Sequence, residues 1–176
     1  REEGLDFSQV VTFNLDEYYG LAADHPQSYH SFMWENFFSH LNIPAEQIHI
    51  PDGNPDDVEA YCREYEEKIA AAGGIDIQVL GVGANGHIGF NEPSDELELD
   101  THLVTLATST IEANARFFAS VDDVPRSAIT MGIRTIFQAK RIMLLATGEA
   151  KAPIIAKMMQ SGVTTHVPAS LLSLHN

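Results

Sequence analysis

A nearly unbroken apolar run over residues 75–82 limits the fold of this chain more than any other feature. Only Asp76, Gln78 and Gly81 interrupt it. Such a run is typical of a strand that is covered on both faces, as strands in parallel sheets are. Because parallel strands need long crossover connections, which are usually helices, the run predicts an α/β domain.

Short apolar runs alternate with helical periodicity along the rest of the chain. The clearest helix is predicted at 55–72, because Asn54 suits an N-cap and Pro55 suits the first helical position. Further helices are predicted at 28–41, 110–118 and 149–160, and further strands at 10–13, 48–50, 102–107, 128–131 and 141–146. This order predicts an open, mainly parallel, doubly wound sheet of the Rossmann-like kind, in a single domain over residues 1–176.

Composition narrows the classes of function. The chain has 25 acidic and 10 basic residues and a formal net charge of −15, so nucleic acid and membrane surfaces are disfavoured as partners. No apolar run reaches the roughly 18 residues of a transmembrane helix. The single cysteine, Cys62, cannot form a disulfide within the chain, which fits a cytoplasmic location. An anionic small molecule remains a candidate ligand where a few basic side chains converge.

Three segments are expected at the carboxyl ends of the strands, where open parallel sheets bind their ligands. They are 14–21, 83–93 and 147–151, and they hold most of the unusual chemistry. The first, NLDEYYGL, places Asp16 and Glu17 directly after a predicted strand. A carboxylate there can act as a general base if its surroundings tune its pKa. Two solvated loop acids are the alternative interpretation.

The second segment, GVGANGHIGFNEP, places His87 among closely spaced glycines and Glu92 five residues later. A histidine can move protons near neutral pH, and a carboxylate can fix its tautomer. A histidine that only hydrogen-bonds within a tight loop is the alternative. The glycines also match the dinucleotide fingerprint G-x-G-x-x-G, but Pro93 follows soon and no long helix clearly begins at the third glycine, which disfavours that interpretation.

Two basic residues are candidates for a phosphate site. Lys151 follows Gly148 at the start of a predicted helix, where backbone amides and an ammonium group attract anions. Arg116 lies in the helix predicted over 110–118, and ordinary solvent exposure is the alternative for both cations. The eight histidines show no H-E-x-x-H motif and no clustered Cys/His spacing, so neither a metal nor another cofactor is expected.

Together these segments resemble the glucosamine-6-phosphate deaminase family, also called glucosamine-6-phosphate isomerase. The resemblance covers almost the whole chain, and NLDEYYGL and GHIGFNEP are its specific motifs. It implies an enzyme, a hydrolase of a C–N bond, that converts glucosamine 6-phosphate and water to fructose 6-phosphate and ammonia. A 6-phosphogluconolactonase-like hydrolase and a non-catalytic sugar-phosphate sensor remain the alternatives; the lactonases share the fold but are not expected to carry both motifs.

The resemblance also implies roles for single residues. Asp16 matches the aspartate that moves a proton between C2 and C1 of the opened sugar, and Glu17 is its neighbour in the motif. His87 matches the histidine that helps open the pyranose ring, and Glu92 matches its carboxylate partner. Asn85 stands where many members carry Asp, so we expect it to orient the catalytic group by hydrogen bonding without adding a charge.

Contacts with the substrate are expected from Glu17, Gly86, Arg116 and Lys151, of which the two cations match the pair that grips the 6-phosphate. Two parts of the family pattern have no match in the sequence: an N-terminal βαβ region with a phosphate loop, and a strand beyond residue 176. The resemblance therefore implies a chain that lacks both. The expected partner is a small amino-sugar phosphate, and a homo-oligomer is compatible with the sequence.

Overall fold

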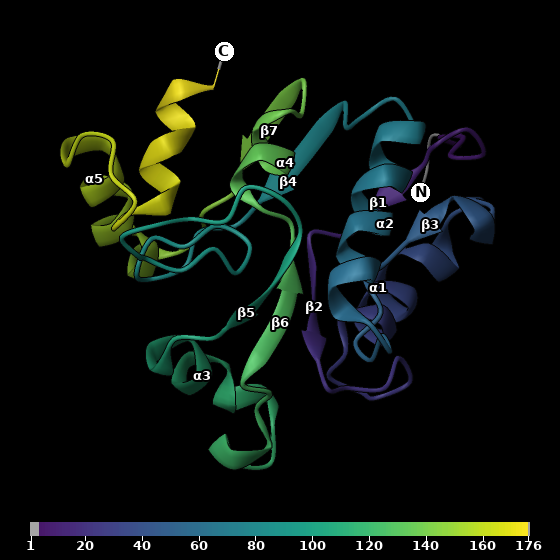
Figure 1. The fold of residues 1–176 in the computed structure, drawn as a ribbon, viewed down its shortest axis with the longest axis horizontal. Coiled ribbons are helices and arrows are strands. Elements are labelled where there is room, and N and C mark those ends of the chain that lie inside the picture. The colour runs from purple at the N-terminus through teal and green to yellow at the C-terminus, as the bar shows by residue number, and fades with distance from the viewer. Residues whose placement is uncertain (1–3, 176) are drawn as a thin grey trace.

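The computed structural model describes residues 4–175 and confirms the α/β class (Figure 1). Its strands form three small sheets. In two of them, two strands run parallel: β1 (Thr12–Phe13) with β3 (Ile48–His49), and β4 (Ile77–Leu80) with β7 (Arg141–Leu144). The third has the order β2 (Asp16–Tyr19), β6 (Ser127–Thr130), β5 (His102–Thr105) and lies at the centre of Figure 1.

Strand pairing is mixed, which differs from the mainly parallel sheet that the sequence predicts. β6 pairs antiparallel with both β2 and β5, so that Asp16 and His102 both lie opposite Thr130. β2 itself is not predicted, since the residues after Asn14 are expected in a loop. Its strand depends on hydrogen bonds to a partner more than 100 residues away, a contact that local sequence does not indicate.

Five α-helices and several 3₁₀ turns surround the strands within residues 4–175. The helices are α1 (Tyr29–Asn36), α2 (Val58–Ala71), α3 (Thr108–Asn114), α4 (Ile133–Phe137) and α5 (Ala152–Gln160). The 3₁₀ turns lie at Phe38–His40, Ala45–Gln47, Ala115–Phe117, Val121–Asp123, Glu149–Lys151 and Pro168–Leu174. Neither α4 nor the turn before the C-terminus is predicted from the sequence. No helix in the described part of the chain has the length and apolar character needed to cross a membrane.

The predicted start of α2 is wrong by three residues. Asp57, not Asn54, caps the helix, and its carboxylate accepts a hydrogen bond from Ala60 N at 2.9 Å. The Asn54 side chain is engaged elsewhere, because its Nδ2 donates to Leu21 O at 2.6 Å. Asn54 therefore ties the start of α2 to the loop that follows β2.

Two apolar clusters hold the elements together. The larger packs α2, α4 and α5 around the end of β4, and its fully buried members include Tyr65, Leu80, Ile88, Met131 and Ile136. The smaller lies between β2, β6 and α3 and includes Tyr18, Phe90, Leu106, Ile111 and Val124. Ile88 and Phe90 belong to different clusters, so the glycine-rich segment 81–92 is held from both sides.

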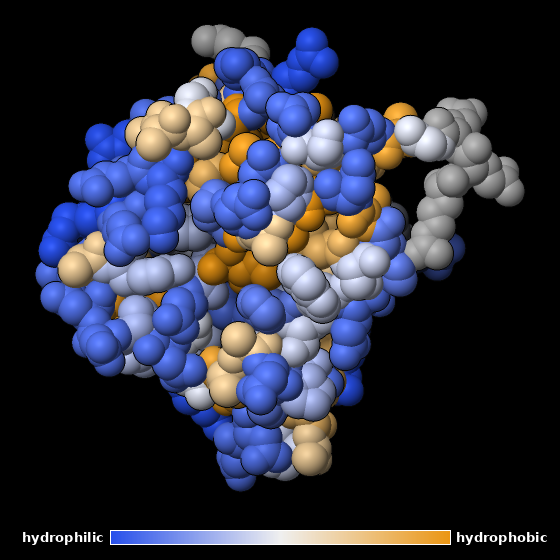
Figure 2. Space-filling view, turned by 90° about the vertical axis from the view of Figure 1, so that its right-hand side faces the viewer, coloured by the Kyte–Doolittle hydropathy of each residue, from blue (hydrophilic) through white to orange (hydrophobic). Residues whose placement is uncertain are grey.

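The strand at 75–82 is not covered on both faces as predicted. Leu80 and Gln78 are buried, but Ile77 and Val79 are 54% and 51% exposed, because no part of residues 4–175 packs over them. The face at the right of Figure 1 is formed by α1, α2 and β3. Figure 2 shows that this face is mainly hydrophilic, with apolar side chains near its middle.

Candidate active site

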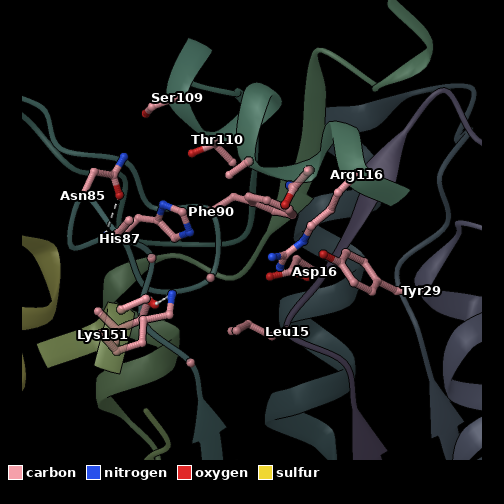
Figure 3. Close-up of a pocket in the computed structure, with 18 residues that line it drawn as sticks. Leu15, Asp16, Tyr29, Asn85, His87, Phe90, Ser109, Thr110, Arg116 and Lys151 are labelled. Atoms are coloured by element: carbon pink, nitrogen blue, oxygen red, sulfur yellow. Dashed lines mark hydrogen bonds between the residues drawn. The ribbon is translucent and has the colours of Figure 1, made fainter. Parts of the chain in front are cut away.

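A cavity of about 670 Å³ opens where β2, the loop after β4, α3 and the turn before α5 meet (Figure 3). All three segments expected at the strand ends contribute to its wall. Five of the predicted site residues line it: Asp16, Asn85, His87, Arg116 and Lys151. These residues are up to 135 positions apart in the sequence, so the fold assembles them. Glu17, Gly86 and Glu92 lie outside the wall.

Asp16 is the first residue of β2, and its side chain lines the cavity. Burial, and after it the charge of the neighbouring Glu17, raise the pKa of Asp16 to about 7. Both protonation states are therefore populated near neutral pH. A carboxyl group of this kind can take up a proton and return it within one reaction.

Glu17 does not contact the cavity, so the predicted contact with the substrate is not supported by its position. Successive strand side chains point to opposite faces, and this one is only 2% exposed. Its carboxylate accepts hydrogen bonds from the backbone N–H groups of Tyr29 at 2.9 Å and His30 at 2.8 Å, and from Tyr18 N at 2.8 Å. Glu17 thus anchors the N-terminus of α1, where an anion is favoured.

His87 lies against the glycine-rich loop. Gly83 N donates to His87 O at 2.9 Å, and a Cβ at Gly83 would overlap the imidazole, so only glycine leaves room for the ring. His87 Nδ1 lies 3.2 Å from Glu92 Oε2, although the ring N–H is not aligned as in a good hydrogen bond. Catalytic hydrogen bonds are often loose before the substrate binds. The pair has the arrangement of an imidazole with an orienting carboxylate.

Glu92 stands behind the cavity wall, where three side chains from two segments surround its carboxylate. Oε2 accepts from Asn85 Nδ2 at 2.7 Å and faces His87, and Oε1 accepts from Thr110 Oγ1 at 2.6 Å. Burial alone would raise the pKa of Glu92, but the contact with His87 and the hydrogen bonds from Thr110 and Asn85 lower it to about 2. Glu92 is therefore an anion throughout the neutral range.

Gly86 shapes the loop and does not reach the cavity, so its predicted contact with the substrate is not supported. Its φ of 98° lies in the region that favours glycine, and an added Cβ would lie 2.9 Å from Val167 Cγ1. Its N donates to Gly83 O at 3.0 Å, and its O accepts from Ala169 N at 2.9 Å. These contacts close the turn that presents Asn85 and His87.

The two predicted cations enter the cavity from different sides (Figure 3). Arg116 lies near Asp16 and Tyr29, and its guanidinium stacks 4.6 Å above the Phe117 ring. Lys151 lies on the side of His87, and its Nζ donates to Val82 O at 2.7 Å. Within residues 4–175 neither cation forms an ion pair. Their charges therefore remain available to an anionic ligand.

Sequence reasoning missed several residues of the wall, among them Tyr29, Ser109, Thr110 and Asn114. Burial raises the pKa of Tyr29, so its hydroxyl stays protonated. Asn114 Nδ2 donates to Tyr18 OH at 2.9 Å, which ties the end of α3 to β2. Nothing in the local sequence distinguishes these positions from ordinary helical residues. No set of three His, Cys, Asp or Glu side chains in the described residues is arranged to hold a metal ion.

The chain is similar to several known proteins. The model of the family "Glucosamine-6-phosphate isomerases/6-phosphogluconolactonase" matches residues 1–176. A glucosamine-6-phosphate deaminase of Thermoanaerobacter sp. (strain X514) is 58% identical over 172 residues, which cover 98% of this chain and 68% of that protein. One of Clostridium acetobutylicum is also 58% identical, over 175 residues that cover 99% of this chain and 73% of that protein.

The chain is also similar to solved structures of this family. A monomeric glucosamine-6-phosphate deaminase of the NagB superfamily superposes with a TM-score of 0.96 at 48% identity, over 99% of this chain and 73% of that one. The 6-phosphogluconolactonase of Thermotoga maritima has a TM-score of 0.74 at 22% identity, over 96% of this chain and 70% of that one, which shows the shared fold alone. The chain therefore belongs to the family of glucosamine-6-phosphate isomerases and 6-phosphogluconolactonases.

Proposed function

We propose that this chain is the catalytic part of a glucosamine-6-phosphate deaminase, which converts glucosamine 6-phosphate and water to fructose 6-phosphate and ammonia. The observation that carries the proposal is one cavity lined by a carboxyl group with a pKa of about 7, by an imidazole and by two cations without ion-pair partners in residues 4–175. Its volume of about 670 Å³ suits a hexose phosphate. The relatives that are 58% identical carry the same activity in their names.

The chemistry begins with ring opening. His87 gives a proton to the ring oxygen as the bond between that oxygen and C1 breaks, and it takes up the proton of the C1 hydroxyl in return, which leaves an aldehyde at C1. Glu92 remains an anion and stabilises the imidazole in its protonated form, as its contact with Nδ1 supports. Asn85 keeps the carboxylate in place through its hydrogen bond to Oε2.

Isomerisation then needs a single group that accepts and returns a proton. Asp16 removes the proton from C2 while the protonated His87 gives one to the C1 oxygen, which gives an enolamine between C1 and C2. Asp16 then returns its proton at C1, which gives the protonated C2 imine of the ketose. Its pKa of about 7 suits both steps at neutral pH. Water adds to C2 and gives one proton to His87. Ammonia then leaves with the proton of the new hydroxyl, so that one water is consumed and the C2–N bond is cleaved. This balance makes the net reaction a hydrolytic deamination.

The phosphate acts as a handle that orients the reacting carbons. Arg116 and Lys151 both line the wall and supply positive charge in a protein whose net charge is −15. Interactions with a remote, non-reacting group can be used to place C1 and C2 near Asp16.

The test is an assay of the full-length protein with glucosamine 6-phosphate, in which ammonia and fructose 6-phosphate are measured separately and appear in equal amounts. The Asp16→Asn variant should bind the substrate and form neither product. Binding of glucosamine 6-phosphate without either product contradicts the proposal and favours a sensor. Hydrolysis of 6-phosphogluconolactone in place of deamination favours a lactonase.

A further inference from the structure

Glu92 presents its two oxygens to different parts of the molecule. Oε2 faces His87 and Asn85, both in the loop after β4, at 3.2 and 2.7 Å. Oε1 faces the start of α3, where it accepts from Thr110 Oγ1 at 2.6 Å and from Ala107 N at 3.4 Å. The first turn of α3 therefore engages Oε1 and is in a position to control which oxygen faces the imidazole.

Thr110 is well placed to exert this control. Its side chain is only 5% exposed, it lies in the wall of the cavity, and its hydroxyl has the short distance expected of a hydrogen bond to a charged oxygen. A hydroxyl has one hydrogen to donate, and here the acceptor is an anion. Six residues later the same segment carries Arg116, in the 3₁₀ turn that continues α3. One short segment thus bears both a phosphate-binding candidate and a contact to the carboxylate behind the imidazole.

We propose that Thr110 is a positioning residue for the ring-opening step, which rests on the deaminase function proposed above. By donating to Oε1, Thr110 fixes the rotation of the Glu92 carboxylate and directs Oε2 at His87 Nδ1. That contact keeps the Nδ1 proton on the side of Glu92 and leaves Nε2 for the ring oxygen of the sugar. Arg116 extends the same effect, because phosphate bound there fixes α3 and through Thr110 fixes the imidazole.

The test compares Thr110→Val, which removes the hydroxyl at nearly constant shape, with Thr110→Ser, which retains it. In the full-length protein Thr110→Val should lower kcat by about tenfold or more with little change in KM, and Thr110→Ser should stay close to the wild type. Thr108→Val is the matched control, since Thr108 is an exposed threonine of the same helix. Its kcat should equal that of the wild type.

A double-mutant cycle identifies the route of the effect. If Thr110 acts through Glu92, Thr110→Val should cost almost nothing once Glu92→Gln is present, because the group that it positions is already lost. An equal loss in both backgrounds overturns the inference, since it shows an effect of α3 that bypasses Glu92. Wild-type kcat in Thr110→Val also overturns it.

A readout that does not need activity separates this inference from the proposed function. In protein labelled with ¹⁵N-histidine, the His87 signals, identified by their loss in His87→Gln, should report Nδ1 protonation in the wild type and in Thr110→Ser. Thr110→Val should show a changed tautomer ratio. This result supports the inference even if no ammonia is formed, whereas an unchanged His87 spectrum in an active enzyme contradicts it.

Discussion

Replacing Asp16 by Asn should stabilise the protein at pH 8 while it abolishes turnover. Burial and the adjacent Glu17 raise the pKa of Asp16 from 3.8 to about 7. Between these two values the folded state keeps a proton that the unfolded state has released, so the free energy of unfolding falls as the pH rises from about 4 to 7. Above pH 7 the whole cost of the charged side chain is present. Asparagine does not titrate and avoids this cost.

The magnitude follows from the size of the pKa difference. About three pH units at about 1.4 kcal/mol each set an upper limit of about 4 kcal/mol. Because Asp16 lines an open cavity and is partly accessible to water, we expect the measured gain in the free energy of unfolding to be about 1–3 kcal/mol. The gain should shrink as the pH is lowered and vanish near pH 4.

Urea denaturation of the wild type and Asp16→Asn at pH 4, 5, 6, 7 and 8 measures this difference. Asp24→Asn, at an exposed aspartate, controls for the general effect of removing one negative charge from an acidic protein. A constant difference between wild type and Asp16→Asn across this range, or one that grows toward low pH, refutes the reasoning.

Three other substitutions test separate parts of the site. Glu17→Gln should lower the free energy of unfolding by about 2–3 kcal/mol in urea titrations, because the amides at the start of α1 lose a charged acceptor. An unchanged free energy of unfolding would argue against this anchoring role. Gly83→Ala should lower kcat by about 100-fold or more and leave the melting temperature nearly unchanged, because the new Cβ displaces the His87 ring. A normal kcat would contradict a catalytic role for the His87 ring in this position. Lys151→Gln should raise KM for glucosamine 6-phosphate by about tenfold or more, whereas Lys157→Gln, at an exposed lysine of α5, should leave it unchanged. Equal KM values for the two variants would exclude phosphate binding by Lys151.

Much of the candidate site could be predicted from the sequence because its parts are local. The strand at 75–82 and the glycines after it predict a turn at a strand end, and His87 lies in that turn. Lys151 lies in the turn that leads into a helix, as the glycine before it predicts. In both cases the neighbours along the chain determine where the side chain points, so the pattern of residue types is sufficient.

What the sequence did not reveal depends on contacts between distant segments. Asp57 caps α2, whereas Asn54 Nδ2 donates to Leu21 O, and no local pattern indicates this contact of Asn54 with the loop after β2. Likewise Thr110 is an unremarkable helix residue until α3 is packed against Glu92. The antiparallel pairing of β2 arises from the position of β6 and could not be predicted from residues 14–21 alone.

The opposite orientations of Asp16 and Glu17 have a consequence for how the acidity of the site can change. The carboxylate of Glu17 holds the N-terminus of α1 through hydrogen bonds, and its negative charge contributes to the high proton affinity of Asp16. Neutralising Glu17 should therefore make Asp16 a weaker base, although no atom of Glu17 lines the cavity. A substitution at the point where a helix is attached would thus also change the pH range in which the sugar can be isomerised.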